Sequence, residues 1–109
     1  MTMWRGLPNI VLVVLDTARY DYWMECFNTC FKTAKMMIFH NAFSTATWTP
    51  PAHASIFTGM YPHQHGVLAK GDTVPSLKSP GLAGKLRKIG YNTYAFSANP
   101  VATPFIGQG

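Results

Sequence analysis

Three apolar runs with few interruptions carry the strongest pattern in the chain. The first, NIVLVVLD at residues 9–16, is continuous and rich in β-branched residues, which is typical of a strand buried on both faces of a parallel sheet. Two shorter runs, MIFHNAF at 37–43 and YNTYAFSA at 91–98, favour two further strands. The pattern therefore predicts a sheet of at least three strands.

Helices are predicted between these strands. Residues 18–37 contain neither Gly nor Pro and space their aromatic and methionine side chains as a helix does. Two prolines suit the first turn of a helix over 50–58, which a glycine follows. A third helix is expected within 79–90, with Ser79 as its N-cap. Residues 60–76 are predicted to form a long loop.

The order strand, helix, strand, helix, helix, strand predicts an α/β fold, with a parallel-rich sheet flanked by helices and right-handed crossovers. We expect a single domain over 1–109, with a short N-terminal extension at 1–7 and an irregular tail at 99–109. Because three strands make a small sheet, the domain is expected to be partial, the first portion of a larger one. Its exposed sheet edge would be a surface for self-association.

Composition narrows the class of protein. The chain has 109 residues, of which 48% are hydrophobic and 12% charged, as in a globular domain. The formal net charge is +5, but only Lys85–Lys88 cluster, so nucleic-acid binding is not predicted. The run at 10–15 is too short to span a membrane and lacks a signal-peptide cleavage site. A cytoplasmic location is the default prediction.

The two cysteines, Cys26 and Cys30, lie four residues apart within a predicted helix. With no further cysteine, the sequence supports neither a structural zinc site nor a disulfide framework. We expect buried or half-buried free thiols in a reducing compartment.

Two oxygen-bearing side chains follow predicted strands. Asp16 ends the first strand, and Thr49 precedes the helix that follows the second, so both should face one rim of the sheet, where ligands of open α/β sheets bind. A helix N-terminus favours an anion, and a divalent metal held by Asp16 and Thr49 would activate the hydroxyl. Oxygen ligands suit Mg²⁺, Mn²⁺ or Ca²⁺, and Zn²⁺ if an imidazole joins. From spacing alone, simple capping explains Thr49 better, and loop capping explains Asp16 equally well.

Other polar residues allow both structural and functional interpretations. His53, four residues after Thr49, can assist at the same rim or be a satisfied buried histidine. Asn99 follows the third strand and can contact an oxyanion or form a turn. His63 and His65 have the spacing of a loop metal motif but lack a third ligand. His40 alternates with apolar neighbours and is interpreted as structural.

Three ordered blocks resemble the N-terminal part of the sulfatase family, in the alkaline phosphatase superfamily. They are PNIVLVVLDTARYD, FHNAFSTATWTPPAHASIFTGMYPHQHGV and LAGKLRKIGYNTYAFSANP, and together they cover roughly residues 8–104. The resemblance implies that Asp16 is a metal ligand and that Thr49 holds the position of the nucleophile, in a motif that aligns as 49–53. It thus reverses the preference for simple capping at Thr49.

Departures from the family pattern narrow the implied chemistry. Sulfatases convert a cysteine or serine to formylglycine, whereas Thr49 could give only a ketone. His53 replaces the arginine of the motif, Ala98 aligns with a lysine, and Thr17 replaces a second aspartate. The resemblance therefore implies a threonine-nucleophile relative, similar to metal-dependent phosphodiesterases and phosphotransferases that act on small anionic esters.

The family's other metal ligands, including an Asp-His pair, come later in its chains, and nothing after Asp72 is acidic here. The resemblance therefore implies an N-terminal fragment of a hydrolase of sulfate or phosphate esters, without significant turnover alone. It implies a divalent metal (Mn²⁺, Mg²⁺, Ca²⁺ or Zn²⁺) in the full-length family site, whereas a carboxylate and a hydroxyl alone hold such an ion poorly. The alternative is a non-catalytic sulfatase-like fragment that serves as a binding or interaction module.

Overall fold

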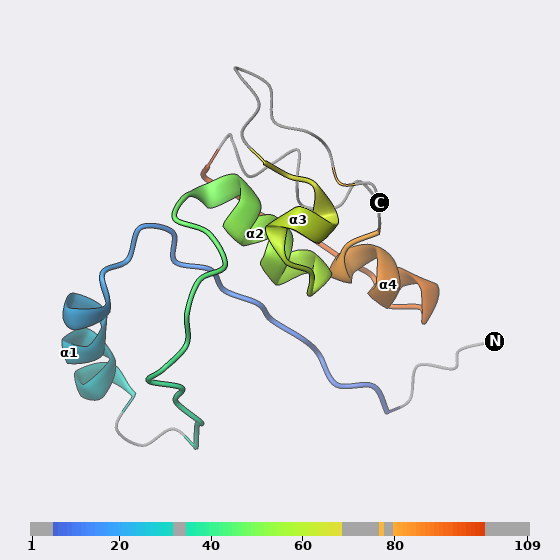
Figure 1. Cartoon of the computed structure of the whole chain (residues 1–109). Helices are drawn as coiled ribbons and strands as arrows, with labels where there is room; N and C mark the ends of the chain where they lie inside the picture. Colours follow the sequence, from blue (N-terminus) through green and yellow to red (C-terminus); the bar gives the residue numbers. More distant parts are fainter. Residues whose placement is uncertain (1–5, 32–34, 69–76, 78–79, 100–109) are drawn as a thin grey trace. The chain divides into compact units, whose positions relative to one another are not determined.

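The computed structural model describes residues 6–31, 35–68, 77 and 80–99. Four helices lie in this part of the chain: α1 (Tyr20–Cys30), α2 (Thr49–Thr58), α3 (Pro62–His65) and α4 (Leu82–Lys88) (Figure 1). The chain divides into two compact units, Met1–Ala42 and Phe43–Gly109. Unit 1 contains α1, unit 2 contains the other three helices, and each is described by itself.

The predicted α/β fold with a parallel-rich sheet is wrong for the described residues, which contain helices and no strand. All three expected strands, at 9–16, 37–43 and 91–98, lack ladder pairing there. Most of their side chains are exposed, with Val11 84% and Phe96 95% accessible. A β-branched run forms a strand only where neighbouring strands take its backbone hydrogen bonds and other elements cover its faces.

Helix α1 occupies only the first part of the predicted helix 18–37. Three aromatic rings, Trp23, Phe27 and Phe31, follow one another at four-residue spacing, with centroids 5.6 and 4.8 Å apart. This aromatic stripe ends at Phe31, whose amide caps the helix by donating to the Phe27 carbonyl. Residues 35–37 are not helical, so the helix ends where its apolar spacing ends.

Helix α2 confirms the helix predicted over 50–58. Pro50 and Pro51 lie in its first turn, where proline's fixed φ suits the helix and its missing amide is not needed. Gly59 ends it in the left-handed region (φ 72°), donating its amide to the Ser55 carbonyl at 2.8 Å. Its N-cap is Trp48, whose side chain makes no capping hydrogen bond.

The short helix α3 lies within the segment predicted as a loop, 60–76. The Gln64 side chain accepts a hydrogen bond from the Tyr61 amide at 2.8 Å, and Gly66 ends the turn at φ 73°. This helix was missed because four residues are too few to show a helical period. Of the predicted loop, residues 69–76 lie outside the described part of the chain.

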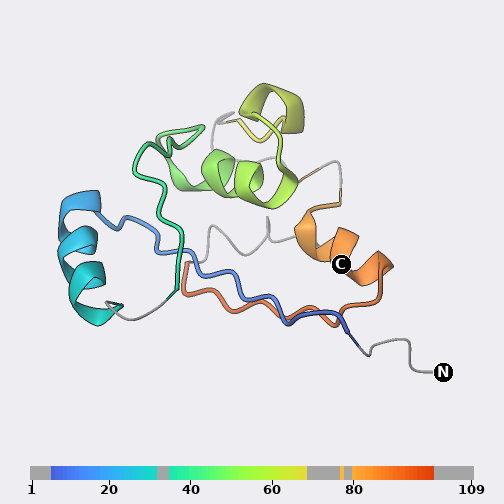
Figure 2. The ribbon, with the colours of Figure 1, turned by 90° about the horizontal axis from the view of Figure 1, so that it is seen from below.

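Helix α4 lies within the predicted 79–90, but its N-cap is Gly81 and the expected cap, Ser79, lies outside the described residues. Both α3 and α4 pack against α2 (Figures 1 and 2). Gly81 lies so close to α2 that an added Cβ would be 3.4 Å from the Phe57 carbonyl oxygen. A Cβ at this cap would thus lie in ordinary van der Waals contact with α2.

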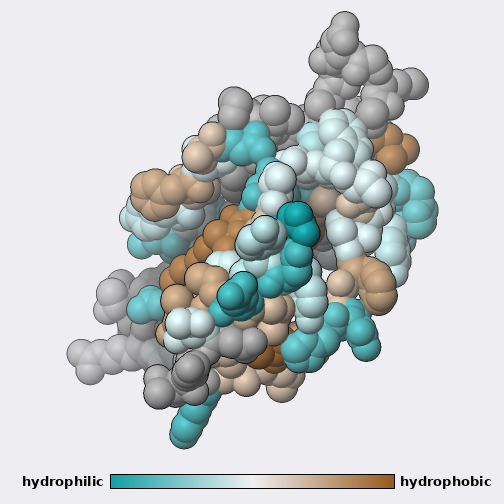
Figure 3. All heavy atoms as spheres, turned by 90° about the vertical axis from the view of Figure 1, so that its left-hand side faces the viewer, coloured by the Kyte–Doolittle hydropathy of each residue, from teal (hydrophilic) through white to brown (hydrophobic). Residues whose placement is uncertain are grey.

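The core of unit 2 is small. Ala54 and Val67 are fully buried and Leu77 packs against them, while Pro50 and Pro51 bury their rings at the start of α2. Many large apolar side chains remain exposed in the described residues, and brown apolar atoms reach the surface in Figure 3. Among the residues described, no helix has the length and apolarity needed to cross a bilayer.

Candidate functional site

Thr49 is the first residue of α2 and is half-buried. The sequence forms a helix here because the extended Trp48 is followed, after Thr49, by two prolines, which cannot continue a strand and fit a first turn. The Thr49 hydroxyl therefore lies at the positive end of the helix dipole. This is the position that a nucleophile or metal-bound hydroxyl would need.

The prolines also limit what the N-terminus of α2 can bind. A helix usually presents several unpaired amides to an anion, but Pro50 and Pro51 have none. The Ala52 amide already donates to the Trp48 carbonyl at 3.4 Å. The expectation that backbone amides would hold an anionic substrate here is therefore weakened. Side chains or a cation must supply most of the attraction.

His53 lies one helical turn after Thr49, on the same face of α2. Its side chain is only 9% exposed and its ring meets Phe57 edge-on at a centroid distance of 6.3 Å. Its Nδ1 atom is buried without a hydrogen-bond partner among the described residues. A buried polar atom left unpaired costs about 1–3 kcal/mol, so His53 is the described side chain of α2 best suited to gain a partner from a ligand.

Asp16 lies in an exposed turn of unit 1, before α1. The following residue, Thr17, has φ +63°, which is unusual for a β-branched side chain. Strained backbone of this kind is concentrated at functional turns. Thr17 occupies the position where the resemblance places a second aspartate, so the strain lies beside the predicted metal ligand.

Asn99 is half-buried in unit 2, where its backbone closes a local turn with Ser97. The Ser97 hydroxyl donates to the Asn99 carbonyl at 3.1 Å. The Asn99 amide in turn donates to the Ser97 hydroxyl oxygen at 3.2 Å. The backbone of Asn99 therefore forms a turn, which was one of the two interpretations of this residue. Its side-chain role stays a prediction.

A buried Ser–His pair that sequence reasoning missed joins α2 to α3. Ser55 Oγ lies 3.0 Å from His65 Nε2, and the Val67 amide donates to His65 Nδ1 at 3.1 Å. Because Nδ1 accepts a hydrogen bond, the proton of the neutral ring is on Nε2 and points at Ser55. His65 therefore cannot take the Ser55 proton, and the pair is a structural link and not a nucleophile with its base.

The electrostatics of His65 agree with a neutral ring. Burial lowers the pKa of His65 from its ordinary value of 6.5, a hydrogen bond with the Pro51 backbone opposes this, and the nearby His63 lowers it slightly further. His63 itself is exposed and stacks on Tyr61 at 5.9 Å. The spacing of His63 and His65 does not produce a pair of free metal ligands, because both nitrogens of His65 are already engaged.

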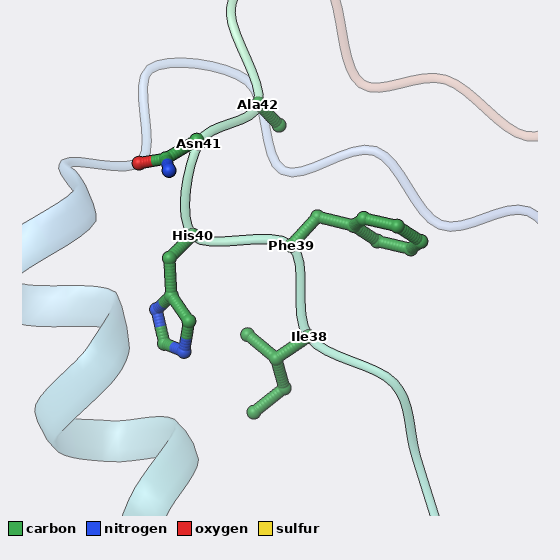
Figure 4. Close-up of a pocket in the computed structure, with 5 residues that line it drawn as sticks. All are labelled: Ile38, Phe39, His40, Asn41 and Ala42. Atoms are coloured by element: carbon green, nitrogen blue, oxygen red, sulfur yellow. The ribbon is translucent and has the colours of Figure 1, made fainter.

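Unit 1 has a shallow surface hollow formed by five consecutive residues, 38–42 (Figure 4). His40 in this hollow pairs its Nδ1 with the Tyr20 hydroxyl at 2.9 Å. That contact ties the hollow to α1 and suits the structural interpretation of His40. The hollow contains none of the predicted site residues.

The described residues contain no group of three His, Cys, Asp or Glu side chains arranged to hold a metal ion. Asp16 belongs to unit 1, whereas Thr49, His53 and Asn99 belong to unit 2. What the structure brings together is Thr49 and His53, one turn apart on α2.

A family model decides the family of this chain. The sulfatase model matches residues 8–102, most of the sequence. The chain belongs to the sulfatase family. Comparisons with curated proteins and with solved structures yield no match. All four predicted site residues, Asp16, Thr49, His53 and Asn99, lie inside the matched range of the sulfatase domain.

Proposed function

We propose that this sulfatase-family chain carries the nucleophile region of a hydrolase or transferase that acts on small anionic esters, with Thr49 as the nucleophile. The observation that carries the proposal is the position of Thr49 as the first residue of α2 in a chain of this family. A threonine cannot form the aldehyde of formylglycine, because its β-carbon bears a methyl group. We therefore favour phosphate esters over sulfate esters.

In the proposed reaction, Thr49 Oγ forms a bond to phosphorus while the bond from phosphorus to the ester oxygen breaks. The Thr49 proton passes to solvent or to a neighbouring base, and the leaving alkoxide takes a proton from water. The phospho-threonine is then cleaved by water or by an acceptor alcohol. The helix dipole favours the anion that develops at Thr49.

His53 is proposed to assist this reaction. Its buried Nδ1 has no partner among the described residues, and it replaces the arginine that the sulfatase motif would place there. A neutral imidazole can accept the Thr49 proton or donate to an ester oxygen. Asn99 is proposed as a further substrate contact.

The donor chemistry of Asp16 and Thr49, a carboxylate and a hydroxyl, suits Mg²⁺, Mn²⁺ or Ca²⁺. Such an ion would supply neutralisation of the negative charge on the phosphoryl oxygens. The described residues nevertheless contain no group of three ligands, so the donor set fits a metal only in part. We therefore propose that residues 1–109 alone turn over substrate slowly at most.

Two threonines allow a matched test. Thr49→Ala should lower the slow hydrolysis of an aryl phosphate diester, measured with added Mn²⁺ or Mg²⁺, to the uncatalysed background. Thr49→Ser keeps a hydroxyl at the same place and should retain most activity. Thr47→Ala, two residues earlier and exposed, should behave as the unmodified chain. Equal turnover by the Thr49→Ala variant would exclude Thr49 as the nucleophile.

A second candidate function is a non-catalytic binding or interaction module. The absence of a three-ligand group among the described residues and the many exposed apolar side chains favour it. Calorimetric titration with Mn²⁺ separates the two candidates. Stoichiometric binding with turnover that Thr49→Ala abolishes would support the enzyme and exclude the interaction module, whereas self-association without metal binding would support the module.

A further inference from the structure

The two cysteine side chains of α1 form a pair on the surface of unit 1. Cys26 and Cys30 are four residues apart, so both lie on one face of the helix. Their Sγ atoms are 3.8 Å apart, and both residues are exposed, contrary to the burial expected from the sequence. The hydrogen bond with Cys30 raises the pKa of the Cys26 thiol. The pair is thus a hydrogen-bonded dithiol.

An intrahelical disulfide does not fit this pair well. Side chains four residues apart on a helix have their Cβ atoms about 5–6 Å apart, whereas a disulfide requires about 3.5–4.5 Å. Closing the bond would require distortion of the last turn of α1. The intact helix therefore favours an arrangement in which another atom lies between the two sulfurs.

A tetrahedral metal ion has the required dimensions. A metal–sulfur distance of about 2.3 Å and a tetrahedral angle of about 109° place two thiolate sulfurs about 3.8 Å apart. This equals the observed separation of the Cys26 and Cys30 sulfurs, 3.8 Å. An ion of this size can thus be bound without any change in the helix backbone.

We propose that Cys26 and Cys30 form a two-thiolate binding site for a soft, thiophilic divalent metal ion of the size of Zn²⁺. Thiolates select such ions over Mg²⁺ and Ca²⁺, which prefer oxygen. Binding forms two metal–sulfur bonds and releases the two thiol protons to solvent. No third side chain completes the site among the described residues, so water or a free small thiol takes the other two positions.

The site is separate from the proposed catalytic function, because it lies on α1 and uses neither Asp16 nor Thr49. The bound ion would bridge the last turn of α1, between Cys26 and the final helical residue, Cys30. Binding is expected to stabilise that turn against fraying, since the ion binds the helical arrangement of the two sulfurs.

Titration of the reduced chain of 109 residues with Co²⁺ tests the proposal. Co²⁺ bound to thiolates gives a sulfur-to-metal charge-transfer absorption, which an oxygen site around Asp16 does not produce. We expect one equivalent of Co²⁺ to develop this band, Zn²⁺ to displace it, and helix content by circular dichroism to rise. Loss of one thiolate should weaken binding by about a hundredfold, because the remaining thiolate no longer holds the ion as part of a chelate.

Three variants make the outcome decisive. Cys26→Ser and Cys30→Ser should each abolish the band under the same conditions. The double variant Cys30→Ser with Asn28→Cys keeps two thiols, at positions 26 and 28. A spacing of two residues places these two thiols on different faces of a helix. This variant should also lack the band. A band that persists in any of the three, or that never develops in the unmodified chain, overturns the proposal.

Discussion

The link between α2 and α3 through His65 provides the sharpest test of the geometry in unit 2. His65 is 5% exposed and Val67 is fully buried, so the Val67 amide has no access to water if its acceptor, His65 Nδ1, is removed. The substitution His65→Phe removes that acceptor and also the contact with Ser55. An aromatic ring still fills the space between the two helices.

The magnitude follows from the bonds that are lost. His65→Phe loses three hydrogen bonds, with Ser55, with the Val67 amide and with the Pro51 backbone. Each contributes about 0.5–1.5 kcal/mol, and an unpaired buried amide costs about 1–3 kcal/mol. Since the first estimate includes part of the second, we expect unit 2 to lose about 3 kcal/mol of its free energy of unfolding. At about 1.4 kcal/mol for each factor of ten, this is about a hundredfold in the opening equilibrium.

The matched control is His65→Asn. Its amide oxygen can occupy the position of Nδ1 and accept from Val67, while the contact with Ser55 is lost. The Ser55 hydroxyl can then turn back to a carbonyl of its own helix, so the expected cost is only about 1 kcal/mol. Hydrogen exchange of the Val67 amide by NMR measures both variants. Equal loss of Val67 protection in the two would refute the role assigned to Nδ1.

The same link predicts a pH dependence. Protonation of His65 places a proton on Nδ1, facing the Val67 amide, and burial lowers the pKa of His65. The folded chain therefore binds fewer protons than the unfolded one, so its stability falls as the pH drops below the ordinary histidine value of 6.5 and levels off below the folded pKa. His65→Asn should lose this part of the pH dependence. An unchanged dependence would contradict the neutral ring.

Two further predictions concern backbone conformation. Thr17→Gly should stabilise unit 1 by up to about 1 kcal/mol, because it removes the strain of a β-branched residue at φ +63°. Thr17→Ala keeps its Cβ and should gain little stability. Identical denaturation midpoints for the two variants would contradict this account. Gly59→Ala should cost about 1–2 kcal/mol through the left-handed conformation alone, since no atom lies within 4 Å of the added Cβ. Gly59→Asn should cost less in the same denaturation assay because Asn tolerates that conformation, and a larger loss would point to a steric cause.

Helix α2 was predictable because its signals are local. Two prolines and a following glycine act on the backbone of their immediate neighbours, so both ends of the helix agree with the sequence to within a residue. The same locality placed Thr49 at the start of α2. The sulfatase blocks were likewise recognisable from residue order alone, and the family match covers them.

The presence of a sheet could not be predicted from local signals, because a strand depends on partners that are distant in sequence. The run at 9–16 has the composition of a buried strand, yet in the described residues it is exposed and unpaired in any ladder. Burial of the histidines also depends on tertiary contacts. Sequence spacing treated His63 and His65 as equivalent, but only His65 turns inward to Ser55 and Val67.

Sequence alone thus determined the family, the helix α2 and the place of Thr49 at its start, since each depends on neighbouring residues. Only the tertiary structure decided that His65 is a structural link and that His53 Nδ1 finds no hydrogen-bond partner among the described residues. It also decided that two thiols face solvent 3.8 Å apart. Hydrogen-bond partners and solvent exposure are set by residues that meet in space, and no local pattern encodes which ones will meet.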